Sequence, residues 1–341
     1  MAMTPYSGDT SVIGQLGTTP QERGLTTQQF KDKFDEGLKA FVEWFNLTHK
    51  TEFEADQAAL ATHKADNAAH GVSHKNLLHN WDFRNPVNQR GQNEYTGSGY
   101  AVDRWHILGN ATATINNEYL SIKTNAVAYI NFRQFIENLK AYYGKTLTFS
   151  VETADGQIYT KTVTLPTSGT VDTSGFFIGD WHIDLYATEA DVSNNVFEFR
   201  FYCTTKADAI INLRRVKLEL GSVSTLANDP PADYGEQLAL CQRYYQKISR
   251  DPIGVGYIIS TGTTAYIAVP TPVTMRTTPT LVGATAGEFR VRQNATDITP
   301  TALDITKYDN CIVLRFTVEG ATAREIAGAY VGANIALSAD L

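Results

Sequence analysis

The sequence predicts a mainly β protein: an N-terminal α-helical coiled-coil neck, then a jelly-roll β-sandwich, then a smaller C-terminal β-sandwich. Two patterns predict this fold class. Residues 24–73 contain no proline and carry apolar residues at helical spacing. After residue 74 the chain consists of short segments rich in threonine and aromatic residues, separated by Gly, Asp, Asn and Ser. The 341 residues are 43% hydrophobic and only 19% charged, a balance that suits β-rich extracellular or particle-forming proteins.

The N-terminal part divides into a polar segment and a helix. Residues 1–23 are rich in Gly, Thr, Ser and Pro, so they are expected to be disordered or extended unless a partner holds them. They lack the basic and apolar regions of a secretory signal, and no such export is expected. The neck at 24–73 is expected to begin at a cap formed by Thr26 or Thr27 and to end at Gly71.

The two halves of this helix have different faces. The first half has an apolar face made by Phe30, Phe34, Leu38, Phe41 and Phe45. The second half places polar residues at heptad spacing, and the proposed layers are His49, Asp56, His63, Asn67 and His70. Polar residues in a coiled-coil seam lower stability but fix register and strand number. Identical copies of the helix are therefore expected to associate. The alternative is a single helix that lies on a domain with its histidines solvated.

Strand patterns dominate the domain predicted at 74–226. The predicted strands are 145–153, 157–165, 176–188, 196–203 and 211–221. One helix is predicted at 133–143, with Gly144 as its C-terminal cap. Regular short strands of this kind indicate a two-sheet jelly roll.

Pro230 and Pro231 mark the clearest domain boundary. Residues 227–249 are predicted to be a linker with a short helix capped by Asp233, whose face is Tyr234, Leu238, Cys241, Tyr245 and Ile248. Residues 250–341 return to strand patterns and fit the smaller sandwich.

Charge and motifs argue against several classes of protein. The net charge of −7 gives no basic excess to neutralise phosphates, so no nucleic acid is expected as a partner. No run approaches the ~18 apolar residues of a membrane span, and membrane insertion is not expected. The three cysteines are odd in number and far apart, which indicates buried reduced thiols. No nucleophile elbow, phosphate loop or zinc-protease motif is present, so no enzyme is predicted. Asp180 and Asp184 share one face of a predicted strand, but this spacing is common among non-catalytic carboxylates.

One stretch carries a resemblance to a known family. Residues 76–107 contain Asn76, Leu77, Leu78, Asn80, Asp82 and Phe83, then Gln89, Arg90 and Gly91, then Asp103, Arg104 and Trp105. In this order they resemble a module of bacteriophage and prophage tail-fibre proteins. The strand RRVKLELGSVST and the segment EQLALCQRYYQKI (236–248) also resemble that module. The resemblance covers about residues 74–341 and includes similarity to carbohydrate-binding jelly rolls.

The resemblance implies a homotrimeric receptor-binding protein of a virion, assembled in the cytoplasm of the host bacterium. Residues 1–23 would dock on baseplate or tail proteins, and the sandwich at 250–341 would form the tip. Its partner at the host would be bacterial surface polysaccharide. Two alternatives remain: a structural baseplate component without its own receptor, and a glycan-degrading enzyme with an accessory sandwich.

Five aromatic residues are the candidates for stacking on sugar rings. They are Trp181, Tyr186, Tyr257, Tyr266 and Tyr308, all in predicted strands or loops. Each could instead be a core residue.

No cofactor is required, but two kinds of ion site are conceivable. Threefold symmetry would bring three copies of His63, and one heptad later three of His70, around an axis, where they could hold a transition metal or an anion. The alternative is hydrated polar layers. A structural calcium ion at Asn80 and Asp82 would match carbohydrate-binding jelly rolls, and ordinary turn hydrogen bonds are the alternative.

Overall fold

The computed structural model describes residues 24, 26–65, 73–248, 252–331 and 335–340. The chain forms two compact units, Met1–Val72 and Ser73–Leu341. The predicted anchoring segment 1–23 lies outside the described residues, as do Asn67 and His70.

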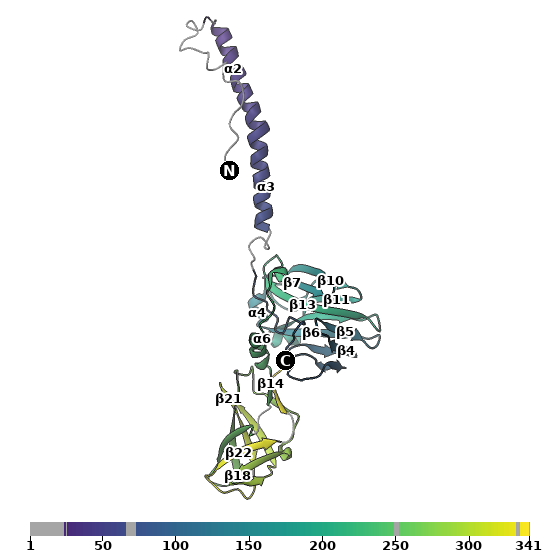
Figure 1. The fold of residues 1–341 in the computed structure, drawn as a ribbon, viewed down its shortest axis with the longest axis vertical. Coiled ribbons are helices and arrows are strands. Elements are labelled where there is room, and N and C mark those ends of the chain that lie inside the picture. Colours follow the sequence, from purple (N-terminus) through teal and green to yellow (C-terminus); the bar gives the residue numbers. More distant parts are fainter. Residues whose placement is uncertain (1–23, 25, 66–72, 249–251, 332–334, 341) are drawn as a thin grey trace. The chain divides into compact units, whose positions relative to one another are not determined.

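The N-terminal unit is one helix. It consists of α2 (Thr27–Trp44), a π-helical turn η1 (Phe45–His49) and α3 (Lys50–Ala65) (Figure 1). The Thr26 hydroxyl accepts a hydrogen bond from Gln29 N, and the Gln29 side chain accepts one from Thr26 N, which confirms the predicted cap. The π turn lies where the apolar face ends and the polar positions begin. Within the described residues of this unit no second helix packs on the first, so the coiled coil remains a prediction.

The β unit begins with two antiparallel sheets that share one core (Figure 1). The first sheet has the order β1 (Glu94–Thr96), β4 (Ala111–Ile115), β5 (Leu120–Thr124), β13 (Ile210–Leu220), β7 (Thr146–Thr153) and β8 (Ile158–Thr164). The second has the order β10 (Phe176–Ile178), β11 (Trp181–Ala187), β12 (Val196–Cys203), β6 (Ile130–Glu137), β3 (His106–Leu108) and β2 (Gly99–Tyr100), with β9 (Val171–Asp172) paired to β11. Four of the five strands predicted between 145 and 221 are present as single strands, and the fifth, 176–188, is divided by a turn at 179–180 into β10 and β11.

Aromatic residues join the two sheets. The Phe149 ring of β7 lies 6.0 Å from the Phe199 ring of β12 and 5.5 Å from the Phe176 ring of β10, measured between centroids. Trp105 stacks on Phe132 at 4.9 Å. Alternation explains this core, because every second residue of a strand points to the same side.

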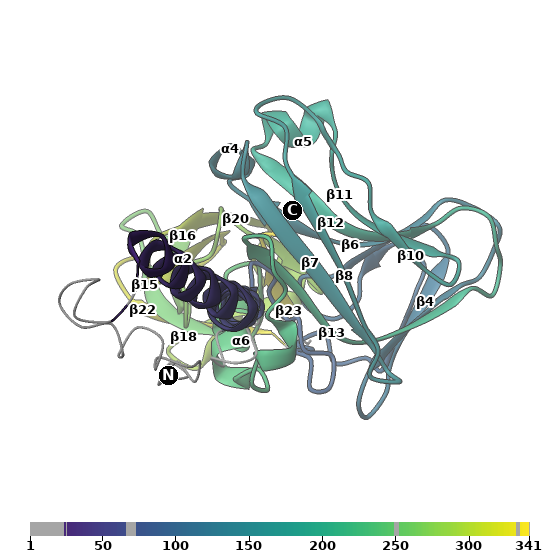
Figure 2. The same ribbon diagram turned by 90° about the horizontal axis from the view of Figure 1, so that it is seen from above.

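The helix predicted at 133–143 is largely wrong. Residues 130–137 form strand β6, and the helix α4 covers only Leu139–Tyr142. Ile130, Phe132 and Ile136 alternate into the core, and this burial outweighs the helical spacing of the same segment. Figure 2 shows α4 and α5 (Glu189–Ser193) at one end of the sandwich, where Leu139 N donates to Asn195 O at 3.1 Å.

The extended segment 76–83 runs beside β13. Leu77 N donates to Leu218 O at 2.8 Å, Val216 N donates to Trp81 O at 3.0 Å, and Phe83 N donates to Arg214 O at 2.9 Å. Val216 and Leu218, two residues apart on β13, point into the core and are buried. Lys217 on the other face is also fully buried, where it contacts Asp229 at 2.5 Å.

A 3-10 turn (Leu226–Asn228) and helix α6 (Tyr234–Gln242) lead to the C-terminal part. Asp233 caps α6, as predicted, by accepting a hydrogen bond from Glu236 N at 2.7 Å. The helix ends earlier than predicted, since residues 245–248 form strand β14 and pair with β23.

The C-terminal part contains a large and a small antiparallel sheet around a second core. The large sheet has the order β19 (Thr296–Ile298), β18 (Phe289–Gln293), β22 (Ile326–Val331), β15 (Gly254–Ile258), β16 (Thr264–Pro270), β21 (Cys311–Thr317) and β20 (Ala302–Lys307). The small sheet has the order β14 (Tyr245–Ile248), β23 (Ile335–Ser338) and β17 (Thr280–Val282), and a 3-10 turn covers Ala286–Glu288. Buried residues of both sheets, including Ile267, Phe316 and Leu337, form the core between them.

Candidate functional site

The outer face of the second sheet gathers aromatic and charged side chains. We use "outer face" for the side chains of β10, β11, β12, β6 and β3 that point away from the core. Strand register places them in three rows: His182, Tyr202, Asn131 and Leu108; Asp184, Arg200, Arg133 and His106; Tyr186, Glu198 and Phe135. A hollow of about 460 Å³ lies over this face.

Arg200 is at the centre of the outer face. Its Nε donates to Asp184 Oδ1 at 2.6 Å, and its Nη2 donates to Asp184 Oδ2 at 3.0 Å. Its guanidinium carbon lies 3.6 Å from the centroid of the Tyr186 ring and 4.7 Å from that of Tyr202. A bidentate ion pair and two cation–π contacts fix the guanidinium and both rings in one geometry. The face is therefore preorganised.

A second ion pair stands beside the first. Arg133 Nη1 donates to Glu198 Oε1 at 2.5 Å, and Asn131 Nδ2 donates to Glu198 Oε2 at 3.2 Å. Burial raises the pKa of Glu198, against the opposite effects of Arg133 and the Asn131 amide. The two arginines and two carboxylates balance in charge, so the centre of the outer face carries no net charge when all four are ionised.

Four buried polar atoms of the outer face have no hydrogen-bond partner among the described residues. They are Asn131 Oδ1, Arg133 Nε, His106 Nδ1 and His182 Nδ1, the last of which lies 3.5 Å from Asp184 Oδ2. Asn131 is only 1% exposed. Burial, with Arg133 and Arg90 nearby, lowers the pKa of His106 to about 4, so its imidazole is neutral at pH 7. Buried polar atoms without partners are costly, and a ligand with donors and acceptors could satisfy them.

Aromatic rings form a row along one edge of the outer face. The Phe177 ring lies 4.5 Å from His182, His182 lies 4.9 Å from Tyr202, and Tyr202 lies 6.1 Å from Tyr129. Phe177 is 66% exposed and Tyr129 is 45% exposed. Connected rings with open faces provide a flat apolar surface beside the polar centre.

The predicted aromatic candidates do not form one group. Tyr186 belongs to the outer face and covers Arg200. Trp181 is fully buried in the core between the sheets, so its prediction as a ligand-stacking residue is corrected. Its inward direction follows from strand alternation, because Ile183 and Leu185 also point inward.

The other three candidates lie in the C-terminal part. Tyr257 and Tyr266 are cross-strand neighbours with ring centroids 5.8 Å apart. Tyr257 is 56% exposed, and Tyr308, in the turn between β20 and β21, is 57% exposed. None of the three lies on a strand of the outer face.

Most residues of the outer face were not among the site residues predicted from the sequence. Arg200 and Glu198 alternate with three phenylalanines in the segment VFEFRFYC. Charged residues that alternate with core aromatic residues indicate that the opposite face of the strand carries polar interactions. The sequence contained this pattern.

Asn80 and Asp82 make hydrogen bonds within the protein. Asn80 Oδ1 accepts from Val87 N at 2.7 Å, while its Nδ2 donates to Val87 O and Asp103 O at 2.9 and 2.8 Å. Asp82 accepts from Arg84 and from Ala232 N. Burial raises the pKa of Asp82, but these hydrogen bonds outweigh it and the pKa lies below its usual range. The structure therefore supports the turn hydrogen bonds that were the alternative to calcium. No group of three His, Cys, Asp or Glu side chains suited to a metal occurs among the described residues.

The predicted axial residues lie on, or beyond, the described helix. His49 Nδ1 is 3.3 Å from Glu52 Oε2, and its ring lies 4.4 Å from Trp44. Asp56 is exposed on α3, and His63 is in the same helix. Asn67 and His70 lie outside the described residues. The polar layers and their metal or anion stay predictions.

Comparison with known proteins gives no family for this chain. No protein-family model matches it, and no curated protein matches it. The geometry of the outer face is therefore the basis for any functional proposal.

Proposed function

We propose that this protein is a non-enzymatic, homotrimeric receptor-binding protein of a phage or phage-derived tail particle, and that it attaches to bacterial surface glycans. The proposal assigns glycan binding to the outer face and a jelly-roll topology to the sandwich that carries it. The observation that carries the proposal is the combination of a row of open aromatic rings with buried, partnerless polar atoms around Arg200.

The chemistry of a sugar matches this combination. A pyranose has an apolar face of C–H groups that stacks on aromatic rings, and its hydroxyls both donate and accept hydrogen bonds. Asn131 Oδ1 would accept and Arg133 Nε would donate. The paired charges favour an uncharged sugar at this centre, because neither sign is in excess.

The helix supports self-association. Phe34, Leu38 and Phe45 are each between 47% and 49% exposed, and no described element of their unit covers them. Long amphipathic helices owe most of their stability to packing. Three copies in parallel would bury this stripe and give three glycan sites acting together.

Among the described residues, no helix has the length and apolar character that crossing a membrane requires.

One observation favours the structural alternative. Val255, Tyr257 and Ile326 are adjacent on the large C-terminal sheet and are 60%, 56% and 79% exposed. A surface of this kind fits a neighbouring subunit as well as a glycan. The protein would then be a baseplate component without its own receptor.

Two double variants separate these functions. Phe177→Ala with Tyr129→Ala removes the open rings of the outer face, and Tyr257→Ala with Tyr308→Ala removes rings of similar exposure from the C-terminal part. Binding of the full chain to a panel of immobilised bacterial polysaccharides should fall about tenfold in the first double variant, on the scale of ~0.5–1.5 kcal/mol per aromatic contact. The second double variant should bind like the unmodified protein. If no polysaccharide binds, or if only the C-terminal variant loses binding, the outer face is not the glycan site.

A further inference from the structure

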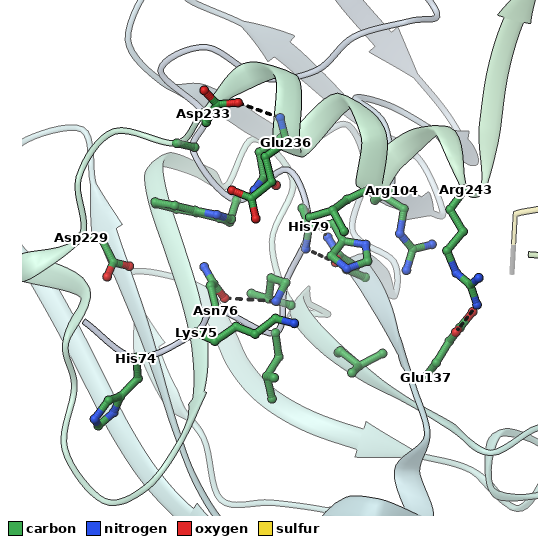
Figure 3. Close-up of a pocket in the computed structure, with 18 of the residues that line it drawn as sticks. His74, Lys75, Asn76, His79, Arg104, Glu137, Asp229, Asp233, Glu236 and Arg243 are labelled. Carbon is green, nitrogen blue, oxygen red and sulfur yellow. Dashed lines mark hydrogen bonds and ion pairs between the residues drawn. The ribbon is translucent and has the colours of Figure 1, made fainter. Parts of the chain in front are cut away.

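A second hollow, of about 600 Å³, lies elsewhere on the β unit (Figure 3). Segment 73–81, the end of β6, the loop 229–233 and helix α6 line it. It shares no lining residue with the hollow of the outer face. Its volume is in the range of sites for small molecules.

Hydrogen bonds hold the walls of this hollow in place. Asn76 binds β13 twice, through Val216 O at 2.8 Å and Leu218 N at 3.0 Å. His79 N donates to Gln134 Oε1, and Gln134 Nε2 donates to His79 O, both at 2.7 Å. Asn80 N donates to Gln237 Oε1 of α6 at 2.7 Å. The hollow is therefore built from the framework of the fold rather than from free loops.

Arg104 is a buried cation in the wall. It is 3% exposed, its guanidinium carbon lies 3.4 Å from the centroid of the Tyr244 ring, and its Nη2 donates to Phe135 O at 2.7 Å. Its Nε has no hydrogen-bond partner among the described residues. The backbone of Arg104 is left-handed, with φ of 74°, a conformation that is costly for a residue with a side chain and is often retained at functional sites. A buried guanidinium with an unused donor is suited to an anionic oxygen.

His79 and Lys75 supply two further donors in the wall of the hollow. Burial, together with Arg104, Lys75 and Arg243, lowers the pKa of His79 to about 3, so its imidazole is neutral. His79 Nδ1 has no hydrogen-bond partner among the described residues. Lys75 is exposed, and no carboxylate of the described chain forms an ion pair with it. Figure 3 shows both side chains among those that line the hollow.

The other charged residues of the hollow are either already in ion pairs or are exposed carboxylates. Arg243 is already paired with Glu137 at 3.1 Å, and Asp229 is paired with Lys217 at 2.5 Å. Asp233 and Glu236 are exposed on the first turn of α6, with Asp233 acting as its cap. Glu236 can accept hydrogen bonds from hydroxyl groups. The hollow thus combines unpaired cationic donors with carboxylate acceptors.

We propose that this hollow binds a monosaccharide that carries a carboxylate, of the uronic acid type. The carboxylate would contact Arg104 Nε and Lys75 Nζ, with the Nδ1–H tautomer of His79 as a third donor. The hydroxyls would donate to Glu236. The site is separate from the hollow over the outer face, where the paired charges favour uncharged sugars.

The test is a titration of the full chain with glucuronate, glucose and acetate, followed by calorimetry. Glucuronate should bind at least tenfold more tightly than glucose or acetate. Lys75→Gln should weaken glucuronate binding about fivefold, and Lys75→Glu should weaken it further. Lys75 is exposed, so neither change should affect folding. Lys145→Gln and Lys145→Glu are matched controls, since Lys145 is exposed and does not line the hollow.

Each contrary outcome overturns a defined part of the proposal. Equal affinity for glucose and glucuronate, or unchanged binding in both Lys75 variants, would show that the cations do not hold a ligand. Equal affinity for acetate would show a simple carboxylate site and overturn the monosaccharide. Loss of glucuronate binding in the Phe177→Ala and Tyr129→Ala double variant would move the ligand to the outer face. If this double variant still binds glucuronate, the result supports the hollow as the binding site, even if no polysaccharide binds the outer face.

Discussion

Arg90 is expected to be a strong determinant of stability, because it joins the sandwich to the C-terminal part. Its Nη1 donates to Asp103 Oδ1 at 2.6 Å, and its Nη2 donates to Asp340 Oδ2 at 2.7 Å. The guanidinium carbon also lies 3.9 Å from the Tyr245 ring centroid and 4.9 Å from that of Tyr100. Asp103 is fully buried, and the Asp340 side chain is 8% exposed.

Arg90→Met keeps most of the apolar stem and removes the charge. Two buried carboxylates then lose their cation, and breaking a buried ion pair from one side costs about 3–5 kcal/mol. The free energy of unfolding should fall by that amount at pH 7.5, and the midpoint of thermal unfolding by roughly 10 °C for a unit of this size. Urea denaturation of the full chain, followed by circular dichroism, measures the change.

The control is Arg292→Met. Arg292 forms a bidentate pair with Asp297 at 2.6 and 2.9 Å, but both side chains are well exposed. Surface pairs of this kind contribute little, so this variant should unfold like the unmodified protein. If Arg90→Met and Arg292→Met have the same effect, burial of the Arg90 cluster does not determine its energy and the reasoning fails.

Three further predictions concern pH, assembly and thiol reactivity. Burial raises the pKa of Asp103 to about 6, above the ~4 of an unfolded chain, so the free energy of unfolding should fall as pH rises from about 4 to about 6. Asp340→Asn removes a neighbouring negative charge and should lower the pKa of Asp103 in an NMR titration; an unchanged pKa would contradict the coupling. Leu38→Asp places a charge in the exposed apolar stripe and should convert a trimer to a monomer in size-exclusion chromatography with light scattering; a monomer before the change would contradict the proposed assembly. Burial raises the pKa of Cys241, so a thiol reagent should modify half-buried Cys311 first and Cys241 only in denaturant, and the reverse order would contradict the buried position.

Features set by neighbouring residues could be predicted from the sequence. The start of the helix is local, because Thr26 and Gln29 satisfy each other's backbone donors. The strands predicted at 145–153, 157–165, 196–203 and 211–221 are confirmed, whereas the one predicted at 176–188 forms a hairpin of β10 and β11. The 133–143 segment fits both the helical and the strand pattern of apolar residues. It becomes a strand because it pairs with β3 and β12, and the local sequence carries no information about that pairing.

The candidate sites depend on register between distant strands. Arg200 and Tyr129 are 71 residues apart, and only the pairing of β12 with β6 brings them together. In the same way, Trp181 and Tyr186 have the same aromatic character in one strand but point to opposite sides. Composition alone could not separate them, although counting along the strand from a known core residue could.

The pairing of segment 76–83 with β13 has a mechanical consequence. A pull on the chain at residue 73 first loads the hydrogen bond of Ser73 to Asp229 and that of His74 N to Thr225 Oγ1. It then reaches segment 76–83, where the Asn76 side chain and the backbone bonds to Leu218 and Val216 resist it. These bonds lie at successive positions along one strand and share the load unless the segment is peeled from its end. If the protein holds a particle against flow, as proposed, these bonds would carry the pulling force before it reached the core of the sandwich.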